Sequence, residues 1–181
     1  MRNTIIFHSA DLDGISSGQS IRHLIPKAFP FEEDTEIVMI GWNYGENKKA
    51  DAILGDIANF DGRQRVYITD VCFPIEHMQS LHALNDHKGV DVIWIDHHQS
   101  QIVESEQYGY DNLPGIRRNG IAACQLVWGW FGHQPPRGIE LLGKYDVWRK
   151  DDEWETETLP FQQKVFAESL DMGDTEWDTF F

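Results

Sequence analysis

The sequence predicts an α/β protein with a mainly parallel sheet, flanking helices and a C-terminal helical segment. Two observations lead to this fold class. First, short apolar segments rich in β-branched residues alternate with segments of helical periodicity, which is typical of parallel sheets with right-handed crossovers. Second, several predicted strands end in acidic or imidazole side chains, and in open α/β sheets ligands bind beyond the carboxyl ends of the strands.

The first unit is a strand, an acidic turn and a helix. Residues 3–7 are strand-like, and apolar residues recur at helical spacing from Ile15 to Ala28. Pro26 is expected to end or kink this helix. Gly14 and the small residues after it would let a ligand approach the helix N-terminus, where free N–H groups and the helix dipole favour phosphate.

Three more strands and several helices complete a Rossmann-like pattern. The strands are expected at residues 36–40, 65–69 and 90–95, with helices at residues 47–60 and 74–85 between them. A polar loop is predicted at residues 100–119, followed by helices at residues 120–131, 138–150 and 159–170. Gly132 and the Pro135-Pro136 pair mark the end of the first of these helices.

Length and composition indicate one domain of ordinary size, or one domain with a short appendage. The apolar fraction of 41% suffices for a hydrophobic core. The 181 residues contain no apolar run of 18 or more, so we expect no membrane span. Cys72 and Cys124 give no disulfide framework, which favours a cytoplasmic location.

The formal net charge of −15 argues against binding to duplex DNA, which requires a basic face. It permits a phosphate substrate held by bound cations. Residues 151–181 carry ten acidic side chains against the single base Lys164, so they hold nine of the fifteen net charges. We interpret them as an acidic helical extension. Its aromatic ending is either a frayed terminus or a docking segment for a partner chain or a second copy.

Acidic and imidazole side chains follow three of the predicted strands. They are His8 with Asp11 and Asp13, then Asp70, then Asp96 with His97 and His98. In a parallel sheet these strand ends lie at one edge, where carboxylates repel one another unless cations lie among them. Hard divalent cations take carboxylate oxygens, and Mn²⁺ also accepts imidazole. The pattern therefore predicts a two-metal site, with Asp70 as the natural bridging ligand.

In these residues the chain resembles the DHH-family phosphoesterases. That family includes RecJ-type nucleases, nanoRNases, cyclic-dinucleotide phosphodiesterases and family II pyrophosphatases. Four motifs stand in the family's order: His8-x-x-Asp11-x-Asp13-Gly14, Asp70 after Tyr67-Ile68-Thr69, Asp96-His97-His98, and Asp146 within Lys144-Tyr145-Asp146-Val147-Trp148. The resemblance covers residues 3–150, and we assign residues 1–150 as the catalytic domain.

The resemblance implies a site for two Mn²⁺ ions, with Mg²⁺ or Co²⁺ as substitutes. The implied ligands are His8, Asp11 and Asp70 for one ion, and Asp13, Asp70, His97 and Asp146 for the other. Asp146 is implied by the resemblance alone. His98 would contact the substrate phosphate, and Asp96 would lie behind the imidazoles and orient them. His98, Asp96 and Asp70 are thus the expected catalytic residues, and a bridging hydroxide would attack phosphorus in line.

Three further residues are candidates for substrate contacts. They are Arg117 and Arg118, which precede the helix predicted at residues 120–131, and Gly120 at its start; arginine binds phosphate well. The two arginines could equally be solvated charges. Most family members also carry a second, glycine-rich domain that binds substrate. The sequence has no Gly-Gly-Gly-His-like stretch, so we expect that domain to be absent, which leaves the choice of substrate open.

The sequence therefore predicts a manganese-dependent phosphodiesterase or exonuclease-like hydrolase. Its expected substrates are short single-stranded nucleic acids or small nucleotides, because the acidic chain disfavours long duplexes. One alternative is a phosphoanhydride hydrolase acting on pyrophosphate or polyphosphate. Another is a non-catalytic regulatory module that kept the fold. The complete ligand set argues against the last, since an inert relative would be expected to lose at least one of these acids.

Overall fold

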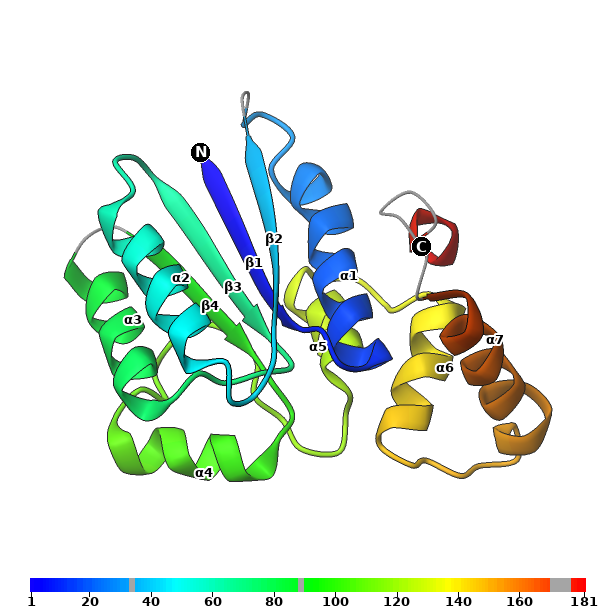
Figure 1. The fold of residues 1–181 in the computed structure, drawn as a ribbon. Helices are drawn as coiled ribbons and strands as arrows, with labels where there is room; N and C mark the ends of the chain where they lie inside the picture. Colours follow the sequence, from blue (N-terminus) through cyan, green and yellow to red (C-terminus); the bar gives the residue numbers. More distant parts are fainter. Residues whose placement is uncertain (33–34, 88–89, 170–176) are drawn as a thin grey trace.

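A four-stranded parallel sheet with the strand order β2-β1-β3-β4 forms the centre of the molecule (Figure 1). The computed structural model describes residues 1–32, 35–87, 90–169 and 177–181. Helices cover both faces of the sheet, and further helices follow toward the C-terminus (Figure 1). The predicted fold class, a mainly parallel Rossmann-like α/β protein with a C-terminal helical segment, is confirmed.

The strands and helices follow the predicted alternation. The strands are β1 (Arg2–His8), β2 (Glu36–Trp42), β3 (Gln64–Thr69) and β4 (Val90–Ile95). The helices are α1 (Leu12–Ala28), α2 (Asn47–Asn59), α3 (Ile75–His87), α4 (Gln99–Tyr108), α5 (Ala123–Trp130), α6 (Arg137–Asp146) and α7 (Leu159–Ser169). A π-helical turn, Trp154–Thr158, leads into α7, and the short 3₁₀ turn Asp178–Phe180 lies near the C-terminus.

Each face of the sheet contributes to a separate hydrophobic cluster. Side chains alternate between the faces of a strand, so neighbouring residues enter different clusters. Ile5, Tyr67 and Ile93 pack with residues of α1, α5 and α6. Ile6, Ile68 and Trp94 pack on the other side with residues of α2 and α3. Burial on both faces explains the uninterrupted apolar runs Ile5-Ile6-Phe7 in β1, Val66-Tyr67-Ile68 in β3 and Val92-Ile93-Trp94-Ile95 in β4.

The prediction of a polar loop over residues 100–119 is wrong for its first half, which is helix α4. Its sequence has no apolar stripe, and Ser105 is its one buried residue, so periodicity cannot reveal it. Contacts outside the helix hold it in place. The Tyr110 hydroxyl donates to Glu104 Oε1 at 2.9 Å, and Gln79 of α3 donates to the Tyr108 carbonyl oxygen at 3.1 Å. Gly109, in the left-handed region at φ 77°, ends the helix.

Other helix ends also differ from the predictions. Pro26 does not end α1, which continues to Ala28. The helix predicted over residues 138–150 ends at Asp146, because Trp148 adopts a left-handed conformation at φ 53°. This position at the end of α6 lets the Asp146 side chain reach the sheet edge.

The acidic extension packs on the rest of the chain wherever the structure describes it. Val165 of α7 and Trp177 are both buried in the cluster that contains α1 and α5. The Phe181 ring lies 4.6 Å from the ring of His23 in α1, and Arg22 forms an ion pair with Asp178. The prediction of a frayed terminus is therefore wrong for residues 177–181, whereas docking of a partner chain or a second copy on this segment stays a prediction. Within the described residues, no helix has the length and apolar character needed to cross a membrane.

The packing predicts unequal losses from two valine truncations. Val66 is fully buried in the β3 core, whereas Val103 on α4 is 49% exposed. We expect Val66→Ala to lower the free energy of unfolding by about 2–3 kcal/mol, because two buried methyl groups are lost and a cavity forms. Val103→Ala should change it by less than about 0.5 kcal/mol. Urea unfolding measures both values, and equal losses would contradict the assigned core.

Candidate metal centre

Imidazoles and carboxylates from several elements meet at the carboxyl edge of the sheet. Three overlapping groups form, each with potential ligand atoms within 4.8 Å of one another. They are His8 with Asp11 and Asp70; Asp70 with His97 and His98; and Asp13 with His97 and Asp146. The structure thus brings together all six predicted metal ligands, and Asp70 and His97 each belong to two groups.

Asp70 lies at the centre of this cluster. Its carboxylate is almost fully buried, with Oδ2 3.7 Å from His8 Nδ1 and Oδ1 3.2 Å from His97 Nε2. Its backbone has φ 58°, in the left-handed region, and its N–H donates to the Ile95 carbonyl oxygen at 3.0 Å. Such a conformation costs a non-glycine residue about 1–3 kcal/mol and persists only where the surroundings enforce it. Pairing with β4 thus fixes the direction of the Asp70 side chain.

Asp11 joins the end of β1 to the start of α1. It is the N-cap of α1, where its Oδ1 accepts from the Gly14 N–H at 2.9 Å. Its Oδ2 lies 2.9 Å from His8 Nδ1. A Cβ atom on Gly14 would lie 2.1 Å from the His8 carbonyl oxygen, so only glycine permits this close turn. The Asp11 cap of α1 and the close turn at Gly14 together hold the side chains of His8 and Asp11 next to each other.

Asp13 has a structural contact in addition to its place in the cluster. Its two carboxylate oxygens accept from the N–H groups of Ala123 and Cys124, both at 2.8 Å. These are the first residues of α5, a helix whose own N-cap residue provides no side-chain hydrogen bond. Asp13 Oδ2 also lies 3.5 Å from His97 Nε2. One buried carboxylate therefore caps α5 and faces the metal-ligand cluster.

The side chains of Asp96, His97 and His98 have three different surroundings. Asp96 is fully buried, and its Oδ1 accepts from the N–H groups of His97 and His98 at 2.7 and 3.1 Å. The same oxygen lies 2.8 Å from His98 Nδ1, so it orients that ring and leaves Nε2 for other partners. His97 turns into the cluster, with Nε2 3.4 Å from Asp146 Oδ2. The geometry matches the expected orienting position of Asp96 for His98.

Burial and mutual repulsion raise the pKa values of two of the carboxyl groups. Burial, together with the charges of Asp70 and Asp146, raises the pKa of Asp13 well above its usual range. Burial also raises the pKa of Asp146 to about 6. For Asp70, burial opposes ionisation, but the imidazoles of His8 and His97 hold its pKa below the usual value. The carboxylates therefore need positive charge among them.

The imidazoles supply that charge when no metal is bound. The carboxylates of Asp11 and Asp70 raise the pKa of His8 to about 10. Burial opposes the protonation of His97, but the carboxylates around it, Asp70 first, raise its pKa to about 9. Protons on these rings thus take the place that divalent cations would occupy.

The cluster fits a divalent metal ion. Among the described residues, His8 Nδ1 and Asp146 Oδ2 are buried side-chain atoms without a hydrogen bond of acceptable geometry, although carboxylate or imidazole atoms lie near both. Asp11, Asp13 and Asp146 also line a cavity of about 130 Å³, which has room for a cation with water. A mixture of carboxylate oxygens and imidazole nitrogens suits Mn²⁺.

The three candidate substrate contacts separate in the structure. The Arg117 guanidinium donates to the carbonyl oxygens of Trp94, Asp111 and Leu113 at 2.7–3.1 Å, so it holds the loop beside β4 and is not available for substrate. Arg118 and Gly120 instead line an open pocket of about 440 Å³. The Arg118 N–H donates to the Asp96 carbonyl oxygen at 3.0 Å, which places this pocket beside the cluster.

Sequence reasoning missed two features of the site. The Tyr44 ring lies edge-on to His8, with ring centroids 5.7 Å apart. The sequence could have revealed this neighbour, because Tyr44 follows β2 directly and the carboxyl end of β2 lies at the same sheet edge as that of β1. The capping of α5 by Asp13 joins residues 110 positions apart and left no local signal.

The fold and the site define a parallel α/β protein whose sheet carries, at its carboxyl edge, a cluster of histidine and aspartate side chains that could hold a metal ion. No protein-family model and no curated protein was found to match the chain. A similar solved structure is that of an uncharacterized protein from Helicobacter pylori G27, with a TM-score of 0.59 and 15% sequence identity. The match covers 82% of this chain and 44% of that chain, so this chain spans under half of its length. At this identity the similarity concerns the fold alone.

The raised imidazole pKa values predict that the metal-free protein loses stability as the pH rises. His8 and His97, with pKa values of about 10 and about 9, keep protons in the folded state that the unfolded chain releases near pH 6.5. Their contribution is fully present below pH 6.5 and is lost as the pH rises through about 9 and 10. A divalent cation must displace these protons, so Mn²⁺ affinity should increase over the same interval. Thermal unfolding with chelator and calorimetric Mn²⁺ titration test both trends, and a constant melting temperature would contradict them.

The two capping aspartates should respond differently to amidation. In Asp13→Asn the side-chain NH₂ group would face a backbone N–H of α5, and we expect a loss of about 1–3 kcal/mol in the free energy of unfolding. Asn caps a helix about as well as Asp, so Asp11→Asn should cost less than about 1 kcal/mol above pH 10, where His8 is neutral and its ion pair with Asp11 no longer contributes. Urea unfolding of the metal-free variants above pH 10 measures both. An equal or larger loss for Asp11→Asn would show that Asp13 does not anchor α5.

Proposed function

We propose that the protein is a Mn²⁺-dependent phosphodiesterase that acts on short single-stranded oligonucleotides or small nucleotides. The central position of Asp70 carries this proposal, because its two oxygens face different ligand groups. A carboxylate shared between two metal ions is the usual arrangement of two-metal hydrolases. The resemblance of the four motifs to the DHH-family phosphoesterases supports the same reaction.

The site residues have distinct functions in this proposal. His8, Asp11 and Asp70 would hold one ion, and Asp13, Asp70, His97 and Asp146 would hold the other. When bound, the ions would supply a hydroxide nucleophile near neutral pH and stabilise charge on the phosphate.

His98 would bind the substrate phosphate in this proposal. Asp96 holds the Nδ1 side of the ring, so Nε2 can donate to a phosphate oxygen. Asp96 also raises the pKa of His98, which favours the protonated form as charge develops on the phosphate. The ring is partly exposed, with its side chain 38% accessible, so a substrate can reach it.

The charge of the chain favours small substrates. With a formal net charge of −15, the protein repels long polyanions beyond the reach of any bound metal ions. A short oligonucleotide or a single nucleotide brings few phosphates outside the site. Cys72 and Cys124 are both buried free thiols, which supports a cytoplasmic location.

Hydrolysis of pyrophosphate or polyphosphate is a second candidate function. The pocket beside Asp96 is lined by three basic side chains, Arg118, Lys144 and Arg149, and these could bind additional phosphate groups. Lys144 already pairs with Asp151 and Glu153, which reduces the charge available. Rates with a dinucleotide, a cyclic dinucleotide and pyrophosphate, all in Mn²⁺, would separate the two activities. A protein that binds Mn²⁺ but hydrolyses none of them would be a regulatory module.

The Asp70→Ala variant tests the proposed function directly. Calorimetric titration of the wild type should show two Mn²⁺ ions per chain, and the variant should bind neither tightly because both ions lose a ligand. Release of mononucleotide from a short labelled RNA should require Mn²⁺ and fall more than about 100-fold in the variant. Asp152→Ala, at an exposed site in the acidic extension, is the matched control and should retain both properties. A wild type that binds no divalent metal would refute the two-metal site.

A further inference from the structure

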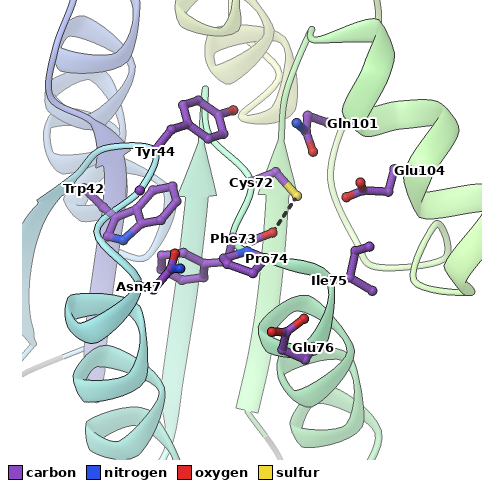
Figure 2. A pocket seen from close by; sticks show the side chains of 11 residues that line it. Trp42, Tyr44, Asn47, Cys72, Phe73, Pro74, Ile75, Glu76, Gln101 and Glu104 are labelled. Carbon is purple, nitrogen blue, oxygen red and sulfur yellow. Dashed lines mark hydrogen bonds between the residues drawn. The ribbon is translucent and has the colours of Figure 1, made fainter.

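A third pocket, of about 310 Å³, lies beside the metal-ligand cluster, since Tyr44 in its lining contacts the ring of His8. Tyr44 and Trp42 form one wall, from the end of β2 and the loop after it, and Gln101 and Glu104 of α4 form the opposite wall (Figure 2). The segment that follows β3 lies between them and includes Phe73. The pocket is therefore built from three segments that are distant in the sequence.

Each wall of this pocket is tied to a residue of the metal-ligand cluster. Phe73 follows Asp70 by three residues, and Gln101 follows His98 by three residues. On the third side the Tyr44 ring contacts the His8 ring edge-on at 5.7 Å. A molecule in the pocket would thus lie next to a phosphate at the metal centre, as the base of a nucleotide lies next to its own phosphate.

The charge of the lining excludes a phosphate as the occupant. None of the eleven residues that line the pocket is lysine, arginine or histidine, whereas Glu76 and Glu104 are acidic. A phosphate would be repelled by these carboxylates. The pocket instead suits an uncharged group that donates hydrogen bonds and has apolar faces.

Tyr44 offers a supported aromatic surface. Its side chain is 48% exposed, and its ring rests edge-on against Trp42 at 5.6 Å. Trp42 in turn contacts Phe73 at 4.9 Å, and both of these residues are buried. An exposed ring held by a rigid buried pair loses little entropy on binding, and such rings are the usual stacking surfaces for nucleobases.

Glu104 supplies a fixed hydrogen-bond acceptor. The Tyr110 hydroxyl, on a buried residue, donates to Glu104 Oε1 at 2.9 Å and so orients the carboxylate. The two oxygens of a carboxylate offer about four acceptor positions, so both can still accept from a ligand. The Gln101 amide lies one turn earlier on the same helix. Guanine presents two neighbouring donors, N1–H and N2–H₂, to a carboxylate, whereas adenine presents a single amino group beside an acceptor.

We propose that this pocket binds the nucleobase of the substrate, guanine in preference to adenine, with the base stacked on Tyr44 and its donor edge toward Glu104. The proposal rests on the proposed function, because the metal centre would receive the phosphate of the same nucleotide. It adds to that function a base-recognition site and a substrate preference.

Hydrolysis of three dinucleotides in Mn²⁺ tests the proposal. They are a guanine dinucleotide, an adenine dinucleotide and an analogue with the same sugar–phosphate chain and no bases. We expect kcat/KM for the guanine dinucleotide to exceed that for the abasic analogue by about tenfold or more, the size of one stacking contact. Tyr44→Ala should reduce this advantage severalfold. Glu104→Gln should reduce the preference for guanine over adenine.

Two variants on α4 serve as matched controls. Tyr108→Ala removes a ring that is 40% exposed and lies outside the pocket lining, and Glu106→Gln neutralises an exposed acid of the same helix. Neither should change the advantage of the guanine dinucleotide over the abasic analogue or over the adenine dinucleotide. Equal rates for the guanine and abasic substrates, or equal effects of Tyr44→Ala and Tyr108→Ala, would overturn the base-binding site. An unchanged guanine preference in Glu104→Gln would overturn the assigned base selectivity.

A binding measurement separates failure of this proposal from failure of the proposed function. If no dinucleotide is hydrolysed, the phosphodiesterase assignment fails. Calorimetric titration of the metal-free protein with GMP and with ribose 5-phosphate then decides the pocket on its own. Tighter binding of GMP that is weakened by Tyr44→Ala, but not by Tyr108→Ala, would support the pocket. Equal affinity for GMP and ribose 5-phosphate would refute it.

Discussion

Burial of several carboxylates at one sheet edge is the constraint on which the structure of this site depends. Asp13, Asp70 and Asp96 are all nearly inaccessible to solvent, and a buried carboxylate without a partner is strongly unfavourable. The fold offsets the cost of burying each of these three carboxylates in a different way. Asp96 accepts hydrogen bonds from two backbone N–H groups, Asp13 accepts from the first two N–H groups of α5, and Asp70 lies between two imidazoles. Asp96 and Asp13 thus stabilise the local fold through backbone contacts, while Asp70 depends on charges that a proton or a metal ion can supply.

The backbone conformation follows from the same requirement. Asp70 points into the cluster because its residue adopts a left-handed conformation at φ 58°, and Asp11 reaches His8 because Gly14 lets α1 begin against the end of β1. Both features cost stability in the isolated segments, and pairing with β4 and packing of α1 against α5 offset that cost. The Asp13 carboxylate of α1 accepts from the first N–H groups of α5, so a residue of the site also holds together two helices of the hydrophobic cluster on that face of the sheet.

The sequence predicted the four strands and most of the site because both depend on local patterns. Apolar runs with β-branched residues mark strands wherever both faces of the sheet are buried, and side chains that follow parallel strands meet at one edge. Asp146 lies far in the sequence from the four strands and follows none of them, so only the motif resemblance predicted its place in the cluster. Helix α4 was not predicted because its own sequence lacks an apolar stripe, and hydrogen bonds from Gln79 of α3 and from Tyr110 hold it in place. The pocket beside Tyr44 was not predicted either, because α4 forms one of the walls of this pocket.

The chemistry on the two sides of the metal-ligand cluster differs in a way that the fold explains. On the side of β2 and α4, the pocket next to His8 is aromatic and acidic, while on the side of α5 and α6, the pocket next to Asp96 is lined by Arg118, Lys144 and Arg149. A nucleotide with its base on the first side would extend its remaining phosphates toward the second, where basic side chains reduce the repulsion from a chain of net charge −15. The opposite orientation would place phosphates against Glu76 and Glu104. The distribution of charge around the sheet edge would therefore select one orientation of a nucleotide whose phosphate lies at the cluster.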